Sequence, residues 1–145
     1  MDSISQQGRT ASERLSHGVR VTVRPRYLPD HSDPDLSHYV FAYHVRIANE
    51  SPRTVMLLHR HWIIIDTDGH SEEVKGAGVV GEQPVLEPGE AFEYTSFCPM
   101  PSAFGTMEGS FHMVDEGGVD LDVEVGRFYL VADVLEDAQE DARGV

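Results

Sequence analysis

The chain has 145 residues, of which 40% are hydrophobic and 25% charged, and its formal net charge is −14. These proportions are those of an ordinary globular protein, and the length suits one domain with its own core. The acidic excess, with Lys75 as the single lysine, leaves no positive surface for a phosphate backbone and argues against duplex DNA or RNA as a partner.

Targeting and redox signals are equally sparse. No apolar run approaches the roughly 18 residues that span a bilayer, and the N-terminal residues lack the apolar centre of a signal peptide. Cys98 is the single cysteine, so an internal disulfide is excluded. Together these features predict a cytoplasmic protein without membrane insertion.

The first 17 residues are polar and without period, which predicts a disordered tail at 1–17. A β-domain is expected over 18–133. Within it, Val19, Val21 and Val23 alternate with polar residues and predict a half-buried strand, which Pro25 places at an edge or a bend. Proline, aspartate and serine make a loop of residues 29–38. The stretch "YVFAYHVRIANE" is the clearest strand of the chain.

A long apolar strand follows in "TVMLLHRHWIIIDTDGH" and ends in Asp68-Gly69, a favourable hairpin pair. "AFEYTSFC" alternates again, "PMPSAFGTMEG" is expected to be irregular, and two further strands flank a hairpin loop at 115–118. An acidic tail is expected over 134–145. About seven or eight strands without helical crossovers predict an all-β, antiparallel sandwich of the immunoglobulin or fibronectin type III kind.

The stretch "KGAGVVGEQP" contains Gly76-x-Gly78-x-x-Gly81, the fingerprint of a dinucleotide-binding turn. That turn needs a helix beginning at the third glycine, and Pro84 and Pro88 prevent one. Two interpretations remain. The glycines form a tight, kinked connection, or their backbone amides form a nest for a small anion such as pyrophosphate or a nucleotide. In the second case Lys75 and Arg60 are the expected cationic neighbours.

His59 and His61 lie two residues apart on an expected strand, so their side chains share a face. This spacing occurs at metal sites on β-scaffolds, and His112 could supply a further histidine. The alternative is a pair of surface or interface histidines. Alternation places Arg60 and Trp62 on the opposite face, where Trp62 is expected in the core.

An oxygen-rich loop at 30–38 could hold Mg²⁺ or Ca²⁺ instead, or be simply solvated; it carries Asp30, His31, Asp33, Asp35 and His38.

The stretches "YVFAYHVRIANES", "GAGVVGEQPVLEPGEAFEYTS" and "GTMEG" resemble the ApaG family, over a region from about Val19 to Val131. The resemblance implies an immunoglobulin-like or fibronectin type III-like sandwich with the glycine motif in a loop and strand of it. It also implies a link to cobalt resistance and magnesium efflux, and a protein partner. The chain departs from the usual pattern at His59, where a small or polar residue is common, and at "EVGRFYL", where a proline is usual.

No acid–base or nucleophilic constellation emerges, because Cys98 has no basic neighbour in sequence and no nucleophile elbow is present. The leading prediction is a non-enzymatic interaction module with a protein partner and no cofactor. The alternatives are a pyrophosphate or nucleotide sensor at Gly76–Gly81 and a binder of divalent cations. An exposed edge strand would also allow a homodimer.

Overall fold

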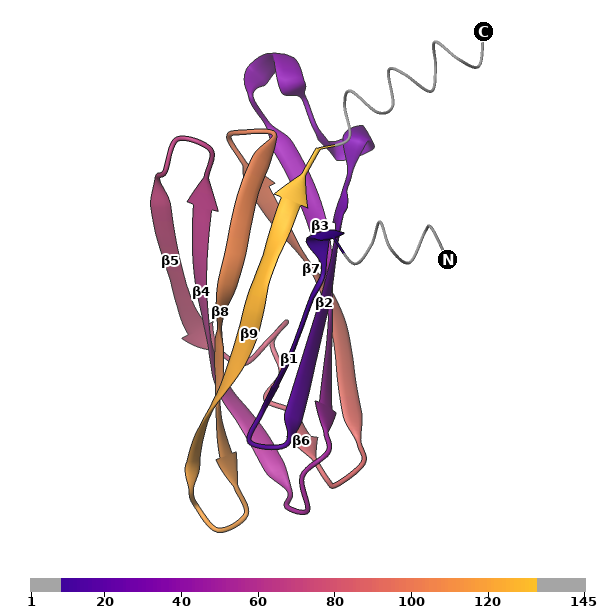
Figure 1. The fold of residues 1–145 in the computed structure, drawn as a ribbon, viewed down its shortest axis with the longest axis vertical. Helices are drawn as coiled ribbons and strands as arrows, with labels where there is room; N and C mark the ends of the chain where they lie inside the picture. The colour runs from indigo at the N-terminus through magenta and orange to yellow at the C-terminus, as the bar shows by residue number, and fades with distance from the viewer. Residues whose placement is uncertain (1–8, 133–145) are drawn as a thin grey trace, which may run out of the picture.

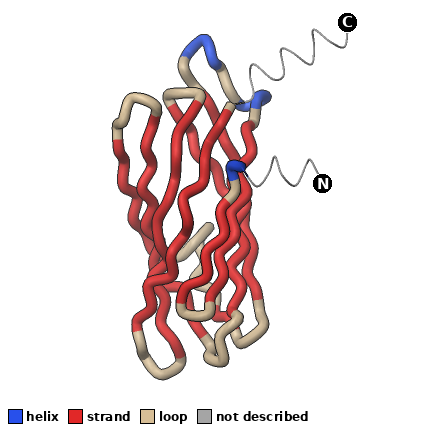
Figure 2. The backbone as a smooth tube through the Cα atoms, in the orientation of Figure 1, coloured by secondary structure: helices blue, strands red, loops and turns tan. Residues whose placement is uncertain are grey.

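A computed structural model describes residues 9–132. The chain folds into two stacked antiparallel sheets (Figure 1). Sheet A has the order β1-β2-β3-β7 and sheet B the order β5-β4-β8-β9, with the two-residue β6 pairing with β4. Most of the described chain is strand, and most of the loops lie at the two ends of the sandwich, with a further loop segment near its middle (Figure 2). The predicted all-β antiparallel sandwich is therefore confirmed.

The strands of sheet A are β1 (Ser12–Ser16), β2 (Val19–Tyr27), β3 (Tyr39–Asn49) and β7 (Ala91–Met100). Those of sheet B are β5 (Ser71–Ala77), β4 (Val55–Asp66), β8 (Phe104–Asp115) and β9 (Asp120–Val131), with β6 (Val85–Leu86) beside β4. Two short 3-10 turns, η1 (Pro29–His31) and η2 (Pro34–Leu36), occupy the expected 29–38 loop. None of the helical segments among residues 9–132 is long and apolar enough to cross a membrane.

The core lies between the sheets and follows from the period-2 pattern. Val19, Val21 and Val23 are fully buried, as the alternation in β2 predicts. Trp62 is 3% exposed and meets the rings of Phe111 and Phe128 edge-on, with ring centroids 5.8 and 5.9 Å apart, an arrangement that aromatic quadrupoles favour. The core position predicted for Trp62 is thus confirmed.

The two sides of the sandwich differ. On one side β1 reaches β9, because Arg14 pairs with Glu124 and the Glu124 amide donates to Ser16 Oγ at 3.1 Å. On the other side, within residues 9–132, β7 and β5 pair with no strand on their outer edges. This open side is where the glycine motif lies.

The structure differs from the expectations in three respects. The sequence predicts a disordered tail at 1–17, yet residues 12–16 form β1, which pairs with β2 from Ser12↔Val23 to Ser16↔Val19. "SERLS" is polar and lacks apolar alternation because β1 is held by backbone pairing and charge, not by burial.

The stretch expected to be irregular belongs mostly to β7 and β8, leaving only residues 101–103 between strands. With β1 and β6 the strands number nine among the described residues, more than the seven or eight predicted. Residues 1–8 and 133–145, which include the predicted acidic tail, lie outside the described residues.

Candidate functional site

The glycine loop, residues 78–84, connects β5 to β6 while both strands pair with the same edge of β4. Val79 and Glu82 exchange backbone hydrogen bonds of 2.8 and 2.9 Å. Between them, Val80 and Gly81 both have positive φ, 43° and 80°, which defines a type I′ turn. No helix follows, so the exclusion of a dinucleotide-binding turn agrees with the geometry.

Three amides of the glycine loop donate within the protein. The Gly78 amide donates to Leu58 O at 2.8 Å. The Val79 amide donates to Glu82 O, and the Glu82 amide donates to Val79 O. Gly78 also permits a close backbone approach, because a Cβ there would lie 2.3 Å from Glu82 O. These facts fit a tight, kinked connection. An anion at this loop stays a prediction, and it would have to use other amides.

The cations predicted beside the loop lie on opposite faces of sheet B. Arg60 pairs in register with Gly76, and Lys75 pairs with His61, one residue along the strand. The Arg60 guanidinium occupies the space left by Gly76, where a Cβ would be 2.8 Å from Arg60 Cζ. Its Nη1 donates to Ala77 O and Gly78 O at 3.0 Å each. Arg60 therefore fastens the start of the glycine loop, while Lys75 is exposed on the outer face.

Arg60 faces the buried phenols of sheet A, whose pKa values burial raises. Desolvation raises the pKa of Tyr94 far above its usual range and that of Tyr43 to a smaller extent, while the Arg60 charge opposes both shifts. Burial also raises the pKa of the Cys98 thiol to about 11. A thiol that stays protonated at neutral pH is a poor nucleophile, which argues against Cys98 as a nucleophile.

The two predicted histidines share the outer face of sheet B and are joined there by His112. His59 and His112 are register partners across β4 and β8, and their rings stack with centroids 6.0 Å apart. The three histidines line a shallow depression of about 670 Å³. Lys75, Ser110 and Asp122 line it too. The sequence thus identified three imidazoles that the fold brings together.

Other candidate cation ligands are dispersed or already occupied. Among residues 9–132, donor atoms of three such residues come within 4.8 Å of one another at Asp66, Asp68 and His70. There Asp66 Oδ1 already accepts the amides of Asp68 and His70 at 2.9 and 3.0 Å, which shapes the β4–β5 hairpin. The acids and histidines of the 29–38 loop form no such group. Binding of Mg²⁺ or Ca²⁺ there stays a prediction.

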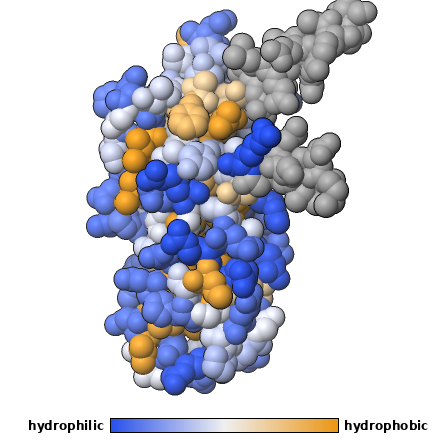
Figure 3. Space-filling view, in the orientation of Figure 1, coloured by the Kyte–Doolittle hydropathy of each residue, from blue (hydrophilic) through white to orange (hydrophobic). Residues whose placement is uncertain are grey.

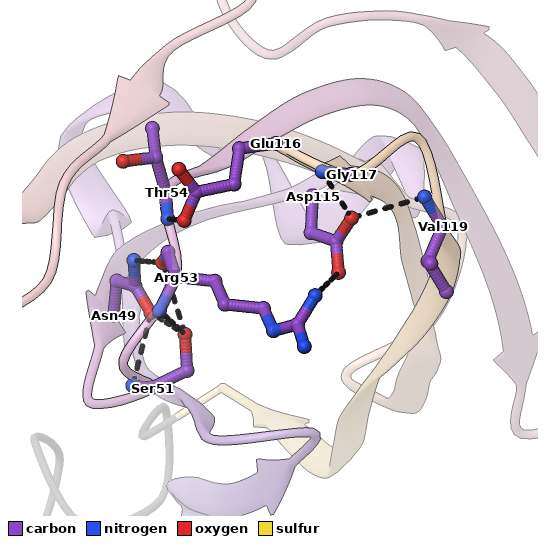
Figure 4. Close-up of polar contacts among 8 residues, drawn as sticks. All are labelled: Asn49, Ser51, Arg53, Thr54, Asp115, Glu116, Gly117 and Val119. Carbon is purple, nitrogen blue, oxygen red and sulfur yellow. Dashed lines mark hydrogen bonds and ion pairs between the residues drawn. The ribbon is translucent and has the colours of Figure 1, made fainter.

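A polar network holds the loops at one end of the sandwich (Figure 4). Asn49 is 1% exposed; its Nδ2 donates to Arg53 O and Leu86 O at 2.7 and 2.9 Å, and its Oδ1 accepts from Ser51. Asp115 Oδ1 accepts the amides of Gly117 and Val119 at 2.8 and 3.0 Å. We call this set the loop network. Its members are Asn49, Ser51, Arg53, Thr54, Asp115, Glu116, Gly117 and Val119. Its polar atoms are used within the fold, which gives it a structural role.

The sequence interpretation missed the outward side of β7. In "AFEYTSFC" the side chains of Tyr94 and Cys98 are buried, whereas Phe97 is 62% exposed. The same alternation that identified the strand could have placed Phe97 on the outside. A single exposed phenylalanine is an ordinary surface feature, but this one lies on the strand whose outer edge is open.

Comparison with known proteins places this fold. A family model described as ApaG domain matches residues 29–115. Protein ApaG of Paramagnetospirillum magneticum is 54% identical over 117 residues, covering 81% of this chain and 90% of the relative. Protein ApaG of Bordetella pertussis is 49% identical over 114 residues, covering 79% and 87%. The crystal structure of a putative ApaA protein from Bordetella pertussis superposes with a TM-score of 0.79 at 47% identity, covering 83% of this chain and 98% of that one. The chain belongs to the ApaG domain family.

Proposed function

We propose that this protein is a non-catalytic interaction module that binds an extended peptide along the open edge of β7. The observation that carries the proposal is the pairing of sheet A, in which β7 has β3 on one side and no described strand on the other. A free strand edge presents unpaired N–H and C=O groups, and peptides can add to it as a further strand.

The two open edges are protected differently. β5 carries Glu72, Glu73 and Lys75 within seven residues, and charges of this kind discourage strand addition. β7 has ten residues and a single charge, Glu93, whose Oε1 is 2.8 Å from His44 Nε2. The hydrogen bond from His44 is the main reason that the pKa of Glu93 is lowered. Of the two edges, β7 is therefore the one that favours a partner.

Pro99 shows which backbone groups face the open edge. A proline fits a strand where its missing N–H would point away from the neighbour. Its register partner Val40 accordingly gives its carbonyl to Leu28 on the far side, at 2.9 Å. Because antiparallel ladders alternate, the N–H groups of Thr95 and Phe97 point to the open edge as well. The accessible stretch thus runs from Ala91 to Cys98, with Phe97 beside it.

The surface seen in Figure 3 favours a strand edge, and not this face, as the place where a partner binds. In Figure 3 hydrophobic residues on that face form separate patches surrounded by hydrophilic ones. A stable interface formed by a face would need a larger continuous apolar patch. Strand addition instead relies on main-chain hydrogen bonds, with side-chain pockets supplying specificity.

The test uses a displayed library of random dodecapeptides panned on the full chain, followed by titration of selected peptides into ¹⁵N-labelled protein. We expect the largest amide shifts at Glu93, Thr95 and Phe97. Thr95→Pro removes one outward N–H and should abolish binding. Thr95→Ala is the matched control, because it also loses the hydroxyl that contacts His44 at 3.0 Å but keeps the N–H. Equal binding by both variants, or shifts remote from β7, would refute the proposal.

A further inference from the structure

The outer face of sheet B carries a histidine cluster that the edge of β7 does not use. We define the histidine cluster as His59, His61 and His112. A β-bulge in β4 creates it. Val55 and Leu57 point into the core, and continued alternation would bury residue 59 as well. The register shifts between Leu57 and His59, so His59 turns outward while Trp62 returns to the core. Bulges commonly re-aim a side chain in this way.

The glycine loop holds the bulge in place. Leu58 O accepts the Gly78 amide at 2.8 Å and Gln83 Nε2 at 3.0 Å. The Gly78 amide can reach Leu58 because the chain turns tightly at Val79–Glu82. The motif that first suggested a nucleotide site therefore orients a histidine on the opposite face of the sheet.

The three imidazoles occupy neighbouring positions on two paired strands. His59 and His112 are directly opposite, and His61 follows His59 on the same face. Directly opposed side chains have Cβ atoms about 5 Å apart, and diagonal neighbours lie about 7–8 Å apart. In the structure the nitrogens of these three rings do not all lie within 4.8 Å of one another, so the rings must turn toward one another to hold one ion. Three neutral imidazoles are also a ligand set that zinc takes at open, tetrahedral sites.

Carboxylates stand behind two of the imidazoles. His61 Nε2 lies 3.0 Å from Glu73 Oε1. His112 Nε2 lies 3.2 Å from Asp120 Oδ1, and its Nδ1 lies 3.6 Å from Asp122 Oδ1. Metal-bound histidines almost always donate their other N–H to a carboxylate, carbonyl or water, which fixes the ring and raises its basicity. His61 has this form. His112 has a carboxylate at each nitrogen, so Asp122, at the longer distance of 3.6 Å, must give up its contact with Nδ1 when this nitrogen binds the ion.

His59 is the histidine of the cluster whose ring can most easily reorient. It is exposed, and in the described part of the chain its ring contacts His112 without a hydrogen bond or ion pair of its own. The stacked ring can therefore turn about its two side-chain torsions toward an ion without breaking a polar contact. The surrounding acids also make the outer face favourable to a cation.

We propose that His59, His61 and His112 bind a late first-row divalent metal ion, represented here by Zn²⁺, with Glu73 and Asp120 orienting two of the rings. The fourth coordination position is open to the depression and to solvent. This face is separate from the β7 edge, so the metal site and the peptide site can be tested independently.

The experiment is calorimetric titration of Zn²⁺ into the full, tag-free chain in a non-chelating buffer, with imidazole ¹⁵N shifts recorded in parallel. We expect one ion per chain and shifts at these three histidines among the eight of the sequence. His61→Ala and His112→Ala should each abolish the heat of binding. Glu73→Gln should weaken it about tenfold, as loss of a carboxylate behind a metal-bound histidine does.

His70→Ala is the matched control, because it removes an exposed histidine next to a carboxylate at the Asp66 hairpin and should leave Zn²⁺ affinity unchanged. Urea midpoints of all variants establish that they are folded. Lack of Zn²⁺ binding by the wild-type chain would overturn the proposal. So would an equal loss in His70→Ala and His112→Ala, or imidazole shifts confined to histidines outside the cluster.

Discussion

The glycine loop and the loop network both fix connections of this sandwich, but by opposite means. The glycine loop uses the backbone: the amides of Gly78, Val79 and Glu82 donate to carbonyls of the chain. The loop network uses side chains, with buried Asn49 and Asp115 accepting or donating at each turn (Figure 4). One region therefore depends on the absence of side-chain atoms, and the other on their presence.

Backbone strain sharpens the contrast. In the glycine loop Val79 is 1% exposed and anchors the turn in the core, while Val80 is 55% exposed at a φ of 43°. A β-branched residue rarely adopts positive φ. Stability does not require Val80 there, since asparagine or glycine suits a type I′ turn better. Strain of this kind concentrates at functional sites, which is consistent with a loop that positions His59.

The largest expected effect distinguishes Gly78 from Gly81, the two glycines of the glycine loop. Gly78→Ala places a Cβ 2.3 Å from Glu82 O at a φ of 64°, so we expect a loss of about 3 kcal/mol in the free energy of unfolding. Gly81→Ala has a similar φ of 80° with nothing within 4 Å, and should lose about 1 kcal/mol. Urea denaturation of both variants measures the difference. Equal losses would show that the close contact with Glu82 does not determine the loop.

The second prediction concerns the loop network. Asn49→Ala removes the side-chain donor that reaches Leu86 O at 2.9 Å and one of the two donors to Arg53 O, the other being Ser51 Oγ at 3.0 Å. It should lower the free energy of unfolding by about 2 kcal/mol. Ser51→Ala removes a more exposed hydroxyl from the same turn and should lose about 1 kcal/mol or less. Urea midpoints decide between them. If Ser51→Ala were the more damaging change, Asn49 would not be the centre of the network.

These regions also show which features of the structure can be predicted from the sequence and which cannot. Alternation predicted the core valines, Trp62 and the common face of His59 and His61, because side-chain direction follows from local period. The Asp68-Gly69 hairpin followed from turn chemistry, and Gly69 has a φ of 84°. The polar β1 was missed because pairing and charge leave no hydrophobic period. The bulge at Leu58 was also beyond reach, since its cause is a glycine-loop amide distant in sequence.

Relief of strain gives the third prediction. Val80→Asn places a residue that tolerates positive φ at the first central position of the turn, and should raise the free energy of unfolding by about 1 kcal/mol. Thermal denaturation at fixed pH and protein concentration measures the gain. Val85→Asn, at another exposed valine that has no positive φ, is the control and should give no such gain. A loss in Val80→Asn would mean that the valine side chain itself stabilises the loop.

The smallest expected effect is a pH dependence of the loop network. Hydrogen bonds from the Val119 and Gly117 amides, with the nearby Arg53 guanidinium, lower the pKa of Asp115 below its ordinary value of 3.8. A depressed carboxyl pKa stabilises the fold fully above that ordinary value, and the contribution is lost as pH falls through the folded-state pKa. Asp115→Asn can still accept both amide hydrogen bonds but cannot titrate.

Denaturation curves of wild type and Asp115→Asn, recorded from neutral pH into the acid range, test this. The difference in free energy of unfolding should be constant above the ordinary pKa and should shrink below it. Glu50 and Glu93, whose pKa values are also lowered, by Arg20 and His44 respectively, contribute equally to both proteins and cancel in the difference. If the difference in free energy of unfolding stayed constant into the acid range, the loop network would hold Asp115 equally well in its protonated form.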